Sequence, residues 1–270
     1  MKRNLLFGVI AMLIAFPTLF AAGYDLTLYS TTAPPAANVM GNGSSAPGFG
    51  VSSWASDATG VGSKSEIYIP VNLLFSSAVT IGDISSISYW TNKSGGSGDP
   101  DWTFYLYTAL QASGNEASWY HTRLNSEPYF TNTPAANDPA NAWHQWSTNA
   151  SSNPMRFYDA GRNGGLYGSY TDPTLADLQG GSINWHDYYS GYASNTVNYG
   201  RENLSLISLQ TGSAWGNGFS GLVDGVTMTR KNGDVARVNL EAVPEPSSIV
   251  LFVSMIGCVG MVIRRRQARA

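Results

Sequence analysis

The feature of this 270-residue chain that most limits its fold is a series of short apolar or alternating runs, separated by clusters of Gly, Asn, Ser and Asp. In the run 102–108, Tyr105 and Tyr107 alternate with Phe104 and Leu106, which is the two-residue period of a strand with one face on a core. Almost no segment keeps the 3.6-residue period of a helix. Strands are expected at residues 25–30, 66–71, 84–91, 102–108, 204–209, 221–230 and 236–240.

These runs predict an all-β fold, an antiparallel β-sandwich of jelly-roll type that forms one domain over residues 23–243. The chain is 43% hydrophobic, a composition that argues against disorder. The middle, residues 132–199, is rich in turn-forming residues and is expected to form extended loops at one end of the sandwich. One short helical turn is expected at 174–178, with Asp172 as its N-cap and Pro173 in its first turn.

Charged residues are sparse and unevenly placed along the chain. Residues 23–243 carry nine Lys and Arg against seventeen Asp and Glu, a net charge of −8. Because no basic stripe is available to neutralise phosphates, nucleic acid is not expected as a partner. The one cysteine, Cys258, lies in a C-terminal apolar segment, so residues 23–243 cannot form a disulfide.

The N-terminal residues 1–22 have the three parts of a secretory signal peptide. Lys2 and Arg3 precede a mostly apolar run over 5–20, and the small residues Ala21 and Ala22 follow it. The sequence therefore predicts an exported chain, with a signal helix that is removed near Ala22. The alternatives are a buried helix and an uncleaved anchor.

The C-terminal residues 244–270 form a second segment of this kind. The sequence Pro244-Glu245-Pro246 precedes an apolar run, and residues 247–263 reach the short limit for a helix that spans a bilayer. A basic tail over 264–270 follows, which includes Arg264, Arg265 and Arg266. Basic residues favour the cytoplasmic side, so the body is expected outside the inner membrane.

The motif, the short helix and the basic tail, in this order, resemble the PEP-CTERM sorting signal. The resemblance implies that an exosortase, a membrane cysteine transpeptidase, cuts near Pro244-Glu245-Pro246. The body would then pass from a transient inner-membrane anchor to the cell surface or the extracellular space. In this family such cargo is associated with exopolysaccharide and biofilm production. The alternative is an ordinary single-pass tail anchor.

The body carries two further resemblances. Residues 215–241 look like the closing hairpin of concanavalin A-like (laminin-G-like) sandwiches, in which an aromatic residue and a glycine precede a Val-Asp-x-Val strand and a final strand ends in an acidic residue. Residues 118–129 are similar to a run found in exported PEP-CTERM proteins. The first resemblance implies a sandwich domain, and the second implies an exported protein.

No catalytic motif stands out, so the chain is expected not to be an enzyme. It has no Gly-x-Ser-x-Gly elbow, no Gly-x-x-x-x-Gly-Lys loop and no His-Glu-x-x-His. Its glutamates are isolated, whereas glycosidases on concanavalin A-like folds place paired glutamates on one strand. Two other functions stay open: a secreted glycan-degrading enzyme, and a structural or adhesive coat protein without a small ligand.

Carbohydrate binding is favoured by eight Trp and fifteen Tyr residues, whose flat rings can stack on sugars. The candidates for stacking are Trp102, Trp119, Tyr120 and Trp185, together with Tyr188 and Tyr189, and core packing is the alternative for each. No cofactor is expected apart from a structural calcium, for which Asp99 and Asp101 supply oxygen ligands. Asp224, before Gly225, is explained by a turn.

Overall fold

The computed structural model describes residues 23–29, 36–37, 39–56, 64–94, 100–108, 123–128, 140–212 and 219–242. Within these ranges strands predominate and almost all pair antiparallel, which confirms the expected all-β class with antiparallel sheets. All seven strands expected from the sequence are present, and their ends differ from the expected ones by two residues or fewer.

The larger sheet has seven strands among the described residues. Its order is β1 (Gly23–Tyr29), β14 (Val235–Glu241), β13 (Gly221–Arg230), β4 (Ser53–Ser56) and β3 (Val39–Asn42), and β6 (Ile84–Lys93) pairs with β13 and with β9 (His144–Ser147). The edge strand β1 runs parallel to β14, unlike the other paired strands of this sheet.

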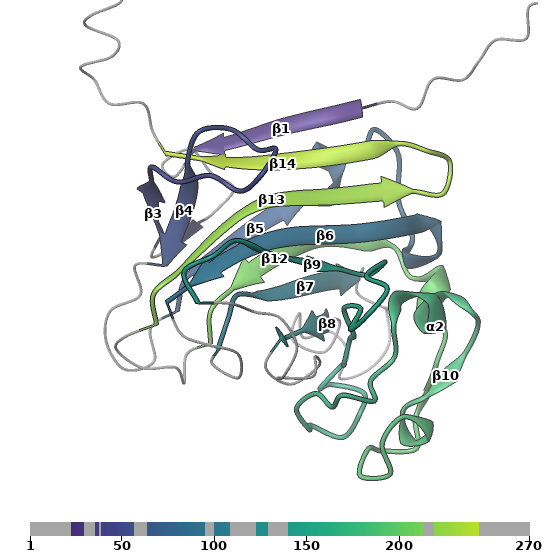
Figure 1. Ribbon diagram of the computed structural model, residues 1–270. Coiled ribbons are helices and arrows are strands. Elements are labelled where there is room, and N and C mark those ends of the chain that lie inside the picture. Colours follow the sequence, from purple (N-terminus) through teal and green to yellow (C-terminus); the bar gives the residue numbers. More distant parts are fainter. Residues whose placement is uncertain are drawn as a thin grey trace, which may run out of the picture.

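The smaller sheet has five strands in the described part of the chain. Its order is β2 (Ala36–Ala37), β5 (Glu66–Pro70), β12 (Leu204–Gln210), β7 (Thr103–Thr108) and β8 (Arg123–Ser126). Figure 1 shows this sheet as a second layer behind the larger one.

One hydrophobic core joins the two layers. The rings of Tyr89 in β6 and Phe104 in β7 stack with their centroids 5.5 Å apart. The Tyr89 hydroxyl donates to the carbonyl of Trp102 at 2.8 Å, and the Trp102 indole donates to the carbonyl of Gly221 at 3.1 Å. The polar atoms of these two core side chains are thereby paired, as burial of an amide or hydroxyl requires.

A β-bulge at Asp224 and Gly225 divides one edge of β13 between two partners. β14 pairs with residues 226–229 and β4 with residues 222–223. Gly225 has a φ of +65°, and the Asp224 carboxylate accepts hydrogen bonds from the backbone N–H groups of Ala46, Gly225 and Leu240. The sequence-based expectation of a turn at Asp224 is therefore wrong. This residue lies in a bulge inside β13, between the part that pairs with β4 and the part that pairs with β14.

Residues 155–201, which we call the lobe, lie beside the ends of the sheets, below and to the right in Figure 1. The lobe holds α2 (Leu175–Gln179), β10 (Ile183–Asn184), β11 (Thr196–Val197) and the 3-10 turns η5 (Trp185–Asp187) and η6 (Tyr199–Arg201). Two further 3-10 turns, η1 (Val71–Leu73) and η2 (Ile81–Asp83), precede β6. The lobe is thus a packed unit with its own buried residues, where extended loops were expected.

The N-cap of α2 differs from the expected one. The hydroxyl of Thr174 accepts the N–H of Asp177 at 3.3 Å, and the Asp177 carboxylate accepts the N–H of Thr174 at 2.8 Å. This reciprocal capping box leaves Asp172 outside the helix, so the expectation of Asp172 as N-cap is wrong.

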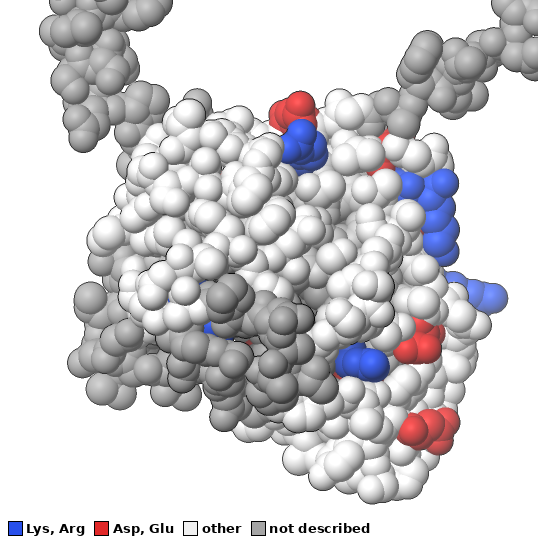
Figure 2. Space-filling view, viewed as in Figure 1, with Lys and Arg blue, Asp and Glu red and all other residues white. Residues whose placement is uncertain are grey.

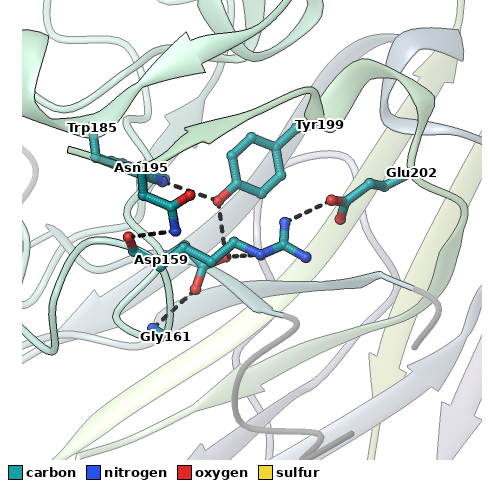
Figure 3. A network of polar contacts seen from close by, with 7 residues as sticks. Asp159, Gly161, Trp185, Asn195, Tyr199 and Glu202 are labelled. Carbon is teal, nitrogen blue, oxygen red and sulfur yellow. Dashed lines mark hydrogen bonds and ion pairs between the residues drawn. The ribbon is translucent and has the colours of Figure 1, made fainter. Parts of the chain in front are cut away.

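A buried polar network fixes the lobe to the smaller sheet (Figure 3). Arg162 donates to the Glu202 carboxylate at 2.6 Å, two residues before β12 begins. Asp159 accepts the Tyr199 hydroxyl at 2.9 Å, and the Trp185 indole donates to the same hydroxyl at 3.2 Å. Burial raises the pKa of Asp159 to about 7, although Arg162 and the Tyr199 hydrogen bond act in the opposite direction.

None of the helices in the described ranges is long and apolar enough to cross a membrane. The expected signal helix at 1–22 and the expected transmembrane helix at 247–263 lie outside those ranges.

Candidate functional site

The smaller sheet carries an unusual set of side chains on the face that is turned away from the core. Ile67, Ile69, Phe104 and Leu106 enter the core, so the residues that alternate with them point to the opposite side. We call that side the tyrosine face, and its members are Glu66, Tyr68, Thr103, Tyr105, Tyr107, Arg123, Asn125, Ser208 and Gln210.

The strand register arranges these residues in rows across the sheet. Ser208 of β12 is opposite Tyr68 on one side and Tyr105 on the other, and Tyr105 is opposite Asn125. In the next row Tyr107 is opposite Arg123. Because the Ser208 side chain is small, it leaves room above the sheet for the larger rings on either side.

Three tyrosine rings fill that room. The Tyr107 ring centroid lies 6.4 Å from that of Tyr68 and 6.3 Å from that of Tyr105, so Tyr107 contacts both. Tyr107 is buried, whereas Tyr68 and Tyr105 are partly exposed. Most other members of the face are buried as well, so Tyr68 and Tyr105 are the two rings of the cluster that a ligand could contact.

Polar groups hold the rings in place. Gln210 donates from Nε2 to the Tyr107 hydroxyl at 3.0 Å, and the Tyr68 hydroxyl donates to Glu66 at 2.9 Å. The guanidinium of Arg123 lies over the Tyr105 ring, 4.8 Å from its centroid, which is a cation–π geometry. Burial raises the pKa of the Tyr105 and Tyr107 hydroxyls, so both are neutral donors at physiological pH.

An unused acceptor lies beside the cluster. Asn125 is buried, and within the described structure its Oδ1 has no hydrogen-bond donor. A buried carbonyl oxygen is normally paired, so this atom suits an ordered internal water.

The two carboxylates near this face are not arranged as a glycosidase pair. Glu66 is in β5 and Glu127 directly follows β8, three strands away, which separates their backbones by ~14 Å. Each carboxylate also has its own partner, because Glu66 accepts the Tyr68 hydroxyl and Glu127 accepts the Tyr158 hydroxyl at 2.9 Å. Burial raises the pKa of Glu127. Retaining and inverting glycosidases need carboxyl groups about 5–9.5 Å apart.

Two of the tryptophans expected to stack on sugars are buried in the core. Trp102 and Trp185 are both 0% exposed, and their indole N–H groups donate to Gly221 and to Tyr199. Both belong to the core, so their assignment as stacking residues is wrong. Trp119 and Tyr120 lie outside the described residues.

The expected calcium ligands are not brought together in the described structure. Asp101 is buried, and its carboxylate accepts the Thr91 hydroxyl at 2.5 Å and the N–H of Trp102 at 2.7 Å. Asp99 lies outside the described ranges. Within those ranges no group of three or more His, Cys, Asp or Glu side chains could hold a metal ion.

Two further expected sites lie outside the described residues: the sorting motif, Pro244, Glu245 and Pro246, and the basic cluster, Arg264, Arg265 and Arg266. The last described residue, Ala242, directly follows β14, which lies between β1 and β13 in the larger sheet.

Comparisons with protein-family models, with curated proteins and with solved structures found no match for this chain. The proposed function therefore depends on the tyrosine face and on the sequence of the two ends.

Proposed function

We propose that this chain is an exported, non-enzymatic protein of the bacterial cell surface, and that it binds extracellular polysaccharide through the tyrosine face. The observation that carries this proposal is the cluster of Tyr68, Tyr105 and Tyr107, fixed on the face of a sheet that does not contribute to the core. The fold that we propose for the body is a jelly-roll sandwich of the concanavalin A-like kind.

The chemistry of the face suits a sugar chain. Aromatic rings offer an apolar surface to the C–H groups of a sugar ring, and their cost in conformational entropy is low. Binding sites for small molecules combine such rings with a few fixed polar groups. Here Glu66 is a partly exposed acceptor at the border of the cluster, and the buried Gln210 and Arg123 hold the rings in place.

Export and sorting form the second part of the proposal. Residues 1–22 would direct export, and an exosortase would process the chain near Pro244-Glu245-Pro246 while 247–263 and 264–270 hold it in the inner membrane. The position of β14 supports this order of events, because this strand ends at Glu241, three residues before the motif begins. A cut near the motif would thus leave β14 intact.

The binding proposal is tested on a glycan array with the full chain, purified in detergent. The wild-type protein should bind at least one class of glycan, and Tyr68→Ala combined with Tyr105→Ala should weaken that binding at least about tenfold. Val51→Ala is the matched control, since Val51 is 80% exposed and lies beside the larger sheet. An array that stays blank with the wild type would favour a coat protein without a small ligand.

The sorting proposal is tested separately by the intact mass of the protein from cells and from medium. A mature species without 247–270 is expected, and replacement of Pro244, Glu245 and Pro246 by alanine should leave the unprocessed chain in the membrane. A secreted species that retains 249–270, or normal release of the alanine variant, would contradict sorting.

A further inference from the structure

Two loops of the lobe form a second surface that is rich in exposed tyrosine. The loops are residues 163–171 and 187–195, and they consist largely of Tyr, Ser, Gly and Asn. The exposed fractions are 40% for Leu166, 71% for Tyr167, 44% for Tyr170 and 47% for Tyr189. Recognition loops in binding proteins have this composition, because Tyr supplies rigid contact area and Ser, Gly and Asn supply adaptable hydrogen bonds.

The two loops lie side by side and are fixed to each other. The Tyr192 hydroxyl lies 3.0 Å from the carbonyl of Tyr167, and the Thr171 hydroxyl donates to the carbonyl of Tyr188. The ring of Tyr189 also packs edge-on against that of Tyr192, with the centroids 5.0 Å apart. These links hold Tyr167, Tyr170 and Tyr189 on one surface.

Each loop is also braced from within. The buried side chain of Asn163 donates to the carbonyl of Leu166 and accepts its N–H, both at 3.1 Å. The Nδ1 of His186 lies 3.1 Å from the carbonyl of Tyr192, which can only accept a hydrogen bond. Below the loops, Trp185 packs edge-on against Tyr192 and belongs to the network of Figure 3. The loop backbones that carry the exposed rings are therefore fixed before any ligand arrives, which lowers the entropic cost of binding.

The charge of this surface indicates which kind of ligand it accepts. Residues 163–195 contain no Lys or Arg, and the charged side chains exposed there are those of Asp177 and Asp187. Figure 2 shows this end of the molecule as mostly uncharged. A phosphate or a uronic acid would find no cation on either loop to pair with. The hydroxyl groups of a neutral sugar, in contrast, can donate to these carboxylates and to tyrosine oxygens.

We propose that the surface formed by Tyr167, Tyr170 and Tyr189 is a second glycan-binding site, specific for neutral polysaccharide. A protein interface is the less favoured occupant, because Leu166 is the only large aliphatic side chain exposed on the two loops and neither loop contains an arginine. The inference rests on the proposed function, but it concerns a different surface from the tyrosine face, and each can be tested without the other.

The test follows nitration of individual tyrosines by tetranitromethane, read by mass spectrometry of the digested full chain in detergent. The probes are cellohexaose, laminarihexaose and xylohexaose, with hexaguluronate as the anionic comparison. Tyr167, Tyr170 and Tyr189 should be nitrated in the free protein and at least about threefold more slowly with a neutral probe. Tyr89 and Tyr199, at 0% and 1% exposure, are internal controls that should stay unmodified.

The variant that combines Tyr68→Ala with Tyr105→Ala separates the two sites. Protection of the three lobe tyrosines in this variant supports the second site, even if the tyrosine face proves inactive. Nitration of the lobe tyrosines that is unchanged by every neutral probe, or slowed only by hexaguluronate, would overturn it. If Tyr68 alone is protected in the wild type, the proposed function stands and this inference fails.

Discussion

The hydroxyl of Tyr192 lies 2.8 Å from Oδ1 of Asp172 and 3.0 Å from the carbonyl oxygen of Tyr167. One hydroxyl proton cannot serve two acceptors fully, so a protonated Asp172 would resolve the conflict by donating to Tyr192. Burial raises the pKa of Asp172 to about 7, which agrees with a carboxyl that is partly neutral near physiological pH.

This geometry predicts different costs for two substitutions at Asp172. Asp172→Asn keeps an acceptor for the N–H of Ser169 and adds a donor for Tyr192, so it should change the free energy of unfolding by less than about 1 kcal/mol. Asp172→Ala leaves the N–H of Ser169 without its acceptor and removes one of the two partners of the Tyr192 hydroxyl, so it should cost about 1–3 kcal/mol. Urea denaturation measures both, and equal costs would contradict the protonated arrangement. Asp187→Ala, at an exposed position, is the control.

The stability of the protein should depend on pH through three buried aspartates. Burial raises the pKa of Asp159 and Asp172 to about 7 and that of Asp224 to about 6, above the unfolded value of 3.8. The folded state then binds protons more tightly than the unfolded state, so stability should rise as the pH falls from 8 through 7 toward 5. Urea denaturation at pH 8, 7, 6 and 5 measures the trend.

A second pair of carboxylates limits this gain at lower pH. Hydrogen bonds lower the pKa of Asp83 and Glu241 in the folded state, so their contribution is lost once the pH falls below their unfolded values of 3.8 and 4.5. The largest stability is therefore expected in the mildly acidic range. A steady increase of stability from pH 5 to pH 8 would show that the buried aspartates are ionised.

The bulge in β13 predicts a cost at Gly225. A Cβ there would lie 2.7 Å from two ring carbons of Phe49, and the φ of +65° already disfavours other residues. Gly225→Ala should cost about 2–4 kcal/mol. Gly48→Ala measures the cost of the positive φ alone, because Gly48 has a φ of +80° and nothing lies within 4 Å of its Cβ position. This variant should be destabilised by about 1–2 kcal/mol. Equal thermal shifts for the two variants would argue against a packed bulge.

Trp102 should contribute to stability and not to binding. Trp102→Phe removes the indole donor to Gly221 and leaves space in the core, so it should destabilise the fold by about 1–3 kcal/mol. Glycan affinity per folded molecule should stay unchanged. A loss of affinity with an unchanged melting temperature would restore Trp102 as a ligand contact.

Most long strands could be read from the sequence, because their two-residue period reflects one buried face, as in β7 and β6. The bulge at Asp224 could not be predicted from the sequence, since Asp-Gly fits a turn as well as a bulge. Only the pairing of β13 with β4 and β14 distinguishes the bulge from a turn. The capping box of α2 was readable in principle from Thr174 and Asp177, but the Asp172-Pro173 pair matched a cap equally well.

The candidate site was harder to predict than the fold. The alternation in 103–108 shows that Tyr105 and Tyr107 share one face, but Tyr68 reaches them only through the register of β12, which pairs residues 140 positions apart. The tryptophans were misassigned because an aromatic residue looks the same in the sequence whether it packs in a core or faces a ligand. Burial is set by tertiary structure, and Trp185 became a core residue of the lobe.

The most direct test of the proposed function is titration of the full chain in detergent with the glycan class selected on the array, followed by calorimetry. Tyr68→Ala with Tyr105→Ala should weaken binding at least about tenfold, while Tyr68→Phe with Tyr105→Phe keeps the rings and should retain most of it. Melting temperatures identify variants that fail to fold. Full affinity in the folded alanine variant would show that the tyrosine face does not bind polysaccharide.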